Sequence, residues 1–195
     1  MKLFLALVPL AVTHLSARTP VPEREGNLPV FRTVLDERPR ILVVRMGPDQ
    51  ALAFDCENGT LWKYWQAKPG ELPVNLQGAV YNGAHGPQPV SQGKILLTDE
   101  KPQLLPSVPE ARLQYLGHLA NSDGTATVRW AFRDAESKTL ATIAVTPAYD
   151  EGAVTLSYKL EAAPAPGFGV SVRPPGSVDG SKQLTTAPLS ITLKP

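Results

Sequence analysis

Cysteine is almost absent from this chain, which has a single one, Cys56, among its 195 residues. One thiol cannot form an internal disulfide, and it cannot supply a C-x-x-C-H haem attachment site or a multi-thiolate zinc site. Histidine is also scarce, and none of the three stands at metal-binding spacing from a second candidate ligand. The sequence therefore predicts neither a metal nor a cofactor.

A surplus of charge of one sign is missing too, because 19 basic and 18 acidic residues leave a formal net charge of +1. Such a surface has no long-range field for gathering polyanions, so nucleic acid is not an expected partner. Helical periodicity does not extend over any convincing length. Twenty prolines and fifteen glycines in a chain that is 43% hydrophobic indicate short apolar segments separated by turns, as in sandwiches and barrels.

The only long apolar run stands at the N-terminus. Residues 1–17 combine Lys2, an apolar stretch from Leu3 to Val12 and small residues at Ser16 and Ala17, which predicts a secretory signal peptide. The alternative is a buried N-terminal strand or helix. Residues 18–29 are proline-rich and charged, which is typical of a tether, and residues 30–195 are expected to form one domain. We therefore expect an exported protein, periplasmic or extracellular, with no membrane span once the signal is removed.

Hydrophobic alternation predicts a series of short strands joined by turns. The expected strands are residues 31–35, 40–46, 51–55, 60–66, 112–119, 125–133, 139–146, 153–161 and 189–193. Strands joined by short loops in chain order favour antiparallel pairing. The predicted fold is all-β, an antiparallel β-sandwich or curved double sheet of the supersandwich kind. The proline- and glycine-rich segment 163–188 is either an ordered cover or a loose loop.

The clearest hairpin joins strands 51–55 and 60–66 through Asn58-Gly59, a strong turn signal. Strict alternation of side chains along the return strand would place Leu61, Lys63 and Trp65 on one face and Trp62, Tyr64 and Gln66 on the other. We expect one of these faces to be core and the other to be exposed.

Aromatic and polar residues around this hairpin have the composition of a carbohydrate-binding face. Flat rings can cover the C–H faces of a sugar while amides and carboxylates bond its hydroxyls. The candidate ligand-binding residues are Trp62, Tyr64, Trp65, Tyr81, Asn82, His85 and Gln88, with Asp55 nearby. The alternative is that two of the aromatics fill the core and the rest cover its edge.

His85 lies in a Gly-Ala-His-Gly-Pro turn whose prolines restrict the backbone. It can therefore be a functional imidazole or a histidine that hydrogen-bonds a neighbouring carbonyl. As a catalytic alternative, His85 and Asp55 would act as acid and base on a carbohydrate. Cys56 is expected to be a buried, inert thiol in a strand, since a nucleophilic cysteine needs a histidine within hydrogen-bond reach.

Two stretches of this sequence carry a resemblance to a known group of proteins. RPRILVVRMGPDQALAFDCENGTLWKYWQ, at residues 38–66, and GAVYNGAHGPQPVSQGK, at residues 78–94, resemble an accessory module of large exported bacterial proteins that carry c-type cytochrome and sugar-dehydrogenase-like domains. The resemblance covers residues 30–97 well and residues 112–162 more loosely. It implies a c-type cytochrome or dehydrogenase partner. The chain lacks C-x-x-C-H, so the redox activity of those relatives does not transfer to it.

The combined hypothesis is an exported, non-catalytic accessory or binding module that binds carbohydrate or a partner redox protein. The alternative is a carbohydrate-active enzyme that uses His85 and a nearby carboxylate, namely Asp55. A purely structural spacer that docks onto a larger assembly is a third hypothesis.

Overall fold

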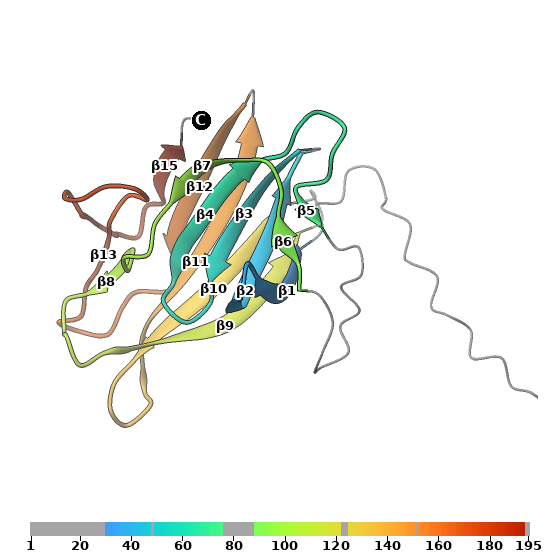
Figure 1. Ribbon diagram of the computed structural model, residues 1–195. Helices are drawn as coiled ribbons and strands as arrows, with labels where there is room; N and C mark the ends of the chain where they lie inside the picture. Colours follow the sequence, from blue (N-terminus) through green and yellow to red (C-terminus); the bar gives the residue numbers. More distant parts are fainter. Residues whose placement is uncertain (1–29, 48, 76–87, 122–124, 151, 194–195) are drawn as a thin grey trace, which may run out of the picture.

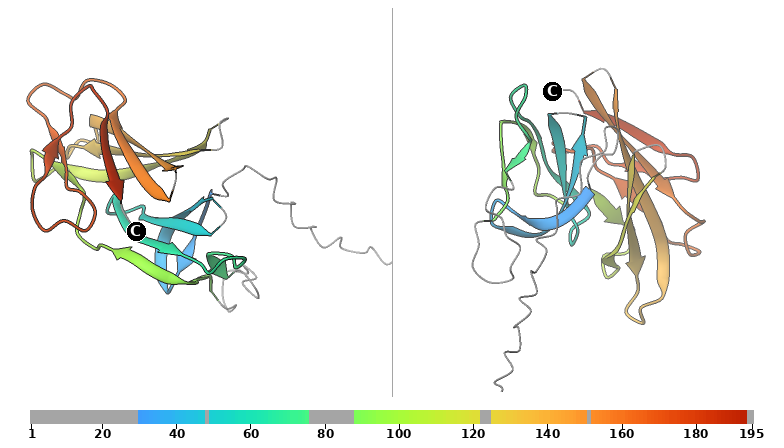
Figure 2. Two further views of the ribbon diagram at one scale, coloured as in Figure 1. Left: turned by 90° about the horizontal axis from the view of Figure 1, so that it is seen from above. Right: turned by 90° about the vertical axis from the view of Figure 1, so that its right-hand side faces the viewer.

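The computed structural model describes residues 30–47, 49–75, 88–121, 125–150 and 152–193. The predicted signal peptide 1–17 and tether 18–29 lie outside these ranges. Over the described residues the chain is all-β without a helix, and its two largest sheets pack as two layers (Figures 1 and 2). The predicted antiparallel double sheet is confirmed.

The first sheet has the strand order β1-β2-β3-β4-β7 and is antiparallel throughout. Its strands are β1 (Val30–Leu35), β2 (Arg38–Met46), β3 (Gln50–Asp55), β4 (Thr60–Gln66) and β7 (Lys94–Thr98). The first four follow one another in the chain and in the sheet, as short hairpin connections require. β7 was not predicted, although its Ile-Leu-Leu run after Gly93 is a strand signal.

The second sheet has the order β15-β12-β11-β10-β9 and is also antiparallel. Its strands are β9 (Arg112–Ala120), β10 (Ala126–Arg133), β11 (Thr139–Asp150), β12 (Ala153–Leu160) and β15 (Leu189–Leu193). All five were predicted, and the alternation of apolar and polar residues is most regular along β10, β11 and β12.

Two smaller sheets complete the described structure. β8 (Leu104–Pro106), β13 (Val170–Val172) and β14 (Lys182–Gln183) form a three-stranded sheet, and β5 (Val74–Asn75) pairs with β6 (Val90–Ser91). Phe168, Val170, Val172 and Leu184 join the main core. The segment 163–188 therefore contributes an ordered cover, which is one of the two alternatives left open by its sequence.

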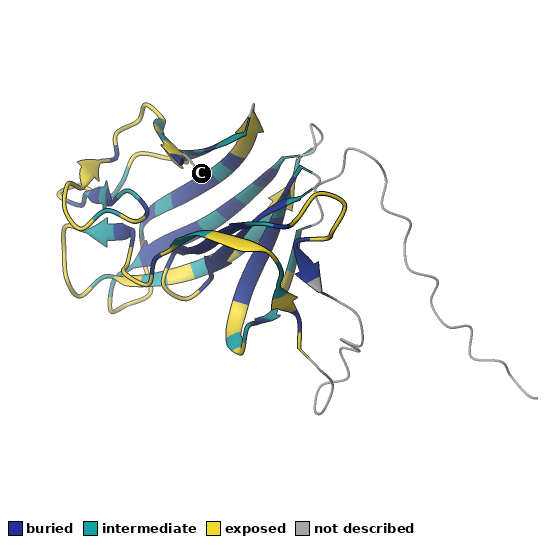
Figure 3. Cartoon of the chain, turned by 45° about the horizontal axis from the view of Figure 1, so that its top comes forward, coloured by how far each residue is buried: buried dark blue, intermediate teal, exposed yellow. Residues whose placement is uncertain are grey.

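The main core lies between the two large sheets. Val128, Trp130 and Phe132 of β10 enter it, as do Ile143 of β11 and Leu156 of β12, and their inward direction was predicted. Figure 3 shows buried residues along the strands of both sheets and exposed residues mainly in the loops and at the edges. Burial of these side chains supplies the main stabilisation of the two layers.

A second, smaller cluster covers the outer face of the first sheet. Its buried members are Leu35, Ile41, Val43, Ala51, Ala53, Trp62, Trp65 and Val74. The first sheet is therefore buried on both faces, so the expectation of one exposed face on β4 is wrong. Apolar residues run continuously along β2 for the same reason, since a strand buried on two sides does not alternate.

A β-bulge in β4 also changes which side chains share a face. Ala53 pairs with Lys63 whereas Phe54 pairs with Leu61, so Trp62 is an extra residue in the ladder. Leu61 and Tyr64 consequently face the main core, while Trp62 and Trp65 belong to the outer cluster. Strict alternation had placed these two tryptophans on opposite faces.

Candidate functional site

The structure places three aromatic residues of the predicted sugar-binding face inside the protein. Trp62, Tyr64 and Trp65 are buried, and Gln88 is exposed. Tyr81, Asn82 and His85 lie outside the described residues. The three buried rings present no flat exposed surface to a sugar.

Each buried ring has defined neighbours. Trp65 Nε1 donates a hydrogen bond to Pro73 O at 2.6 Å, and the Tyr64 hydroxyl donates to Gln50 Oε1 at 2.6 Å. The Trp62 ring has two cations within cation–π range, with Arg38 Cζ at 4.9 Å and Lys63 Nζ at 4.4 Å from its centroid. These contacts give the tryptophans structural roles in holding the hairpin against its surroundings.

Asp55, the proposed acid or base, is occupied by the turn that follows it. Its carboxylate accepts hydrogen bonds from the backbone N–H groups of Glu57 and Asn58 at 2.9 and 3.2 Å. It also accepts a hydrogen bond from Asn58 Nδ2 and forms an ion pair with Arg38 at 2.8 Å. A carboxylate that satisfies four donors in this way organises the β3–β4 turn.

Cys56 lies in the same turn, immediately after β3 rather than within a strand as predicted. It is buried, and burial raises the pKa of its thiol to about 11. Tyr115, on β9, bonds through its hydroxyl to His118 Nδ1 at 2.9 Å. A thiol with a raised pKa is a poor nucleophile, and its predicted inertness agrees with this geometry.

A buried ion pair anchors the end of β7. Arg173 Nη2 lies 2.9 and 2.8 Å from the two carboxylate oxygens of Asp99, and the side chains are only 8% and 6% exposed. Backbone N–H groups of Lys101 and Gly176 and the amide of Gln103 also donate to Asp99. Burial by itself raises the pKa of Asp99, but these hydrogen bonds outweigh it and leave the pKa below its ordinary value.

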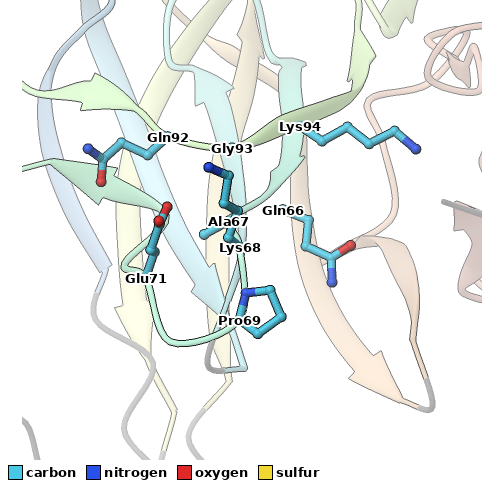
Figure 4. A pocket seen from close by; sticks show the side chains of 8 residues that line it. All are labelled: Gln66, Ala67, Lys68, Pro69, Glu71, Gln92, Gly93 and Lys94. Atoms are coloured by element: carbon cyan, nitrogen blue, oxygen red, sulfur yellow. The ribbon is translucent and has the colours of Figure 1, made fainter.

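A groove lies at the other end of β7, where two segments distant in sequence meet. It has a volume of about 640 Å³, and its lining residues are Gln66, Ala67, Lys68, Pro69, Glu71, Gln92, Gly93 and Lys94. Figure 4 shows Lys68 and Glu71 reaching from the connection after β4 toward Gly93, while Gln92 and Lys94 extend away from each other. Two lysines, one glutamate and two glutamines make this lining polar, with one more cation than anion.

Backbone contacts hold the walls of the groove in place. Gln92 N–H donates to Pro73 O at 2.9 Å, and Ala67 N–H donates to Asp49 O at 2.7 Å. Gly93 has a φ of +113°, and a Cβ at this position would lie 2.1 Å from Gln66 O. Only glycine fits such a close approach of two backbones, so Gly93 sets the spacing of the walls.

The wall that carries β6 is also tied to the β1–β2 turn. Asp36 N–H donates to Pro89 O at 3.1 Å, and the Asp36 carboxylate accepts from Ser91 N–H at 2.9 Å. Burial tends to raise the pKa of Asp36, but the bonds from Lys63 and Ser91 lower it overall. The groove is therefore preformed by contacts from three parts of the first sheet.

Large exposed apolar side chains adjoin both lining segments in the sequence, although none of them lines the groove itself. Leu72 follows the first lining segment and is 51% exposed, while Val90 and Ile95 flank the second and are 42% and 52% exposed. Sequence reasoning missed this site because its walls are 26 residues apart along the chain, from Gln66 to Gln92. The Pro69-Gly70 turn and the strand signal after Gly93 were the available indications of it.

Within the part of the chain that the structure describes, no three histidine, cysteine, aspartate or glutamate side chains gather as a metal site would require. Those same residues contain no helix long and apolar enough to cross a membrane. The fold and the groove together define an antiparallel double-sheet protein with a polar groove beside β7. Comparison with protein families, with curated proteins and with solved structures found no match.

Proposed function

We propose that this protein is an exported, non-catalytic binding module that docks a partner protein through the groove beside β7. The observation that carries the proposal is the exposure of Leu72, Val90 and Ile95, which stand next to or close to the lining residues of this groove in the chain. Apolar side chains rimmed or flanked by polar groups are typical of protein-binding surfaces.

The chemistry of the groove defines the kind of partner segment it fits. Lys68 and Lys94 outnumber the single acid, Glu71, so a carboxylate on the partner is favoured over a cation. Leu72 and Ile95 would cover an apolar side chain of that segment. The expected ligand is therefore a peptide segment with an apolar residue next to an acidic one, on a c-type cytochrome or dehydrogenase as the sequence resemblance suggests.

The groove supports a protein ligand better than a sugar, because no aromatic ring of the described residues lines it. The catalytic alternative finds no support in the surroundings of Asp55, whose oxygens are engaged by Arg38 and by the β3–β4 turn. A general acid or base needs an oxygen that can reach its substrate.

The test begins with chemical crosslinking of the secreted protein in its source cells, followed by purification of the crosslinked partner and calorimetry with the two pure proteins. Ile95→Asp should weaken binding by at least about tenfold, since burying an unpaired charge in an interface is costly. The matched control is Val178→Asp, because Val178 is 74% exposed and lies outside the groove.

Equal binding by the protein and its Ile95→Asp variant would contradict the proposal, and so would equal loss in the Val178→Asp control. A parallel fluorescence titration with neutral oligosaccharides tests the carbohydrate hypothesis. A saturable signal there, in the absence of any protein partner, would replace the docking function with sugar binding.

A further inference from the structure

A second cavity lies in the β1–β2 hairpin, away from the groove. It has a volume of about 430 Å³ and is lined by Arg32, Thr33, Val34, Pro39 and Arg40. The pairing register shifts between Thr33 and Leu35, so a bulge interrupts the ladder beside the cavity. Two arginines thus line one cavity at an irregular point of the sheet.

Arg32 carries a positive charge that no carboxylate neutralises among the residues the structure describes. Its guanidinium lies 5.2 Å from the centroid of the Tyr115 ring, which orients the side chain without cancelling its charge. The charge acts on its neighbours. The pKa of His118 lies below its ordinary value, first through burial and then through the field of Arg32.

Arg40 is held in an unusual conformation on the opposite strand. Its φ of 58° is in the left-handed region, which residues other than glycine adopt at an energetic cost. Cys56 N–H donates to Arg40 O at 3.2 Å, and the Nη1 atom of Arg40 pairs with Glu57. This pairing leaves the other N–H groups of the guanidinium available to a ligand.

We propose that the cavity between β1 and β2 is an oxyanion site, in which the guanidinium groups of Arg32 and Arg40 bind a sulfate, phosphate or carboxylate group. Guanidinium presents parallel N–H donors that match the oxygens of such groups, and two arginines line this cavity. A bound anion also neutralises the uncompensated charge of Arg32. The site is independent of the proposed docking groove.

The experiment is a titration with sodium sulfate, at constant ionic strength balanced with sodium chloride, followed by NMR of the His118 ring. Besides Arg32, the titratable group that contacts His118 among the described residues is Tyr115. Bound sulfate cancels the field of Arg32, so the pKa of His118 should rise and the rise should saturate. Arg32→Gln should abolish the sulfate-dependent rise, and Arg40→Gln should weaken sulfate binding about tenfold.

The control variant is Arg112→Gln, which removes the same charge from β9 without touching the cavity and should leave the response intact. A sulfated oligosaccharide and its unsulfated form identify the carrier of the anion. If the sulfated sugar binds more tightly than inorganic sulfate, the oxyanion that the site takes is part of a larger ligand. If the two bind equally, the ligand is the free ion. No saturable rise in the unmodified protein, or an undiminished rise in Arg32→Gln, overturns the proposal.

Discussion

Replacing Asp99 with asparagine is expected to destabilise the fold strongly. Asp99 and Arg173 form a nearly fully buried ion pair, and Asp99 accepts hydrogen bonds from Lys101, Gln103 and Gly176 as well. Asparagine removes the negative charge and turns one acceptor into a donor that faces other donors. Arg173 then keeps its charge in a buried position without a counter-ion.

The expected loss follows from this geometry. Removing one partner of a buried ion pair costs about 3–5 kcal/mol, because the other charge stays desolvated. For a chain of this length the loss corresponds to a fall of about 6–20 °C in melting temperature. The backbone carbonyls of Lys101, Pro102 and Ser177 also accept from Arg173, which favours the lower half of this range.

Urea denaturation at pH 7 measures the free energy of unfolding of the protein, of Asp99→Asn and of a double variant with Arg173→Gln. The double variant should lose less than the sum of the two single losses, since the pair is coupled. A loss below about 1 kcal/mol in Asp99→Asn would refute the view that this pair anchors β7 and the segment after β13.

The pH dependence gives a second measure of the same pair. The pKa of Asp99 is lowered in the folded state, so the unfolded chain binds the proton more readily. Stability from Asp99 is therefore present above its unfolded pKa and is lost as pH falls toward the folded pKa. Asp99→Asn should flatten the acid limb of the stability curve, and an unchanged limb would contradict the assignment.

Three further predictions concern single residues. Gly93→Ala should destabilise the protein by at least about 3 kcal/mol in urea denaturation, because its Cβ would overlap Gln66 O at a left-handed φ. Gly70→Ala, with open space around it, is the control. Equal losses of stability in the two variants would contradict the close approach at Gly93. Cys56 should resist thiol reagents at pH 8 until the protein unfolds, since its pKa of about 11 leaves little thiolate. Rapid labelling of the folded protein would contradict this prediction and would show that the thiol is accessible. The pKa of His118 is lowered in the folded state, so its contribution to stability is present above pH 6.5 and is lost as pH falls below it. Arg32→Gln should reduce this loss of stability. An unchanged pH profile of stability would exclude the field of Arg32 as a cause of the lowered pKa.

Most strands of the two large sheets could be predicted from the sequence. In β10, β11 and β12, apolar and polar residues alternate, and each inward-facing set enters the core as expected. Alternation is a local property that depends on which side of one strand is buried. The missed strands β5, β6, β8, β13 and β14 have two or three residues each, too few to show a period, whereas β7 was missed despite its apolar run.

The candidate site could not be predicted in the same way. The aromatic side chains of Trp62 and Trp65 indicated a sugar-binding surface, but only the tertiary structure shows that both lie in the outer cluster. The bulge at Trp62 shifts the alternation, so that the residues on either side of it no longer follow one period. The extra residue is defined by the pairing of β4 with β3 and is not apparent from β4 alone. Burial on the second face depends on segments elsewhere in the chain.

The sequence by itself determined an all-β chain of short strands, an almost neutral surface and a single thiol, because these are properties of composition and of neighbouring residues. Only the tertiary structure decided which residues share a site. Gln66 and Lys94, Arg32 and Tyr115, and Asp99 and Arg173 are each brought together by the packing and pairing of separate strands. Such contacts arise from sheet order and register, which no local pattern specifies.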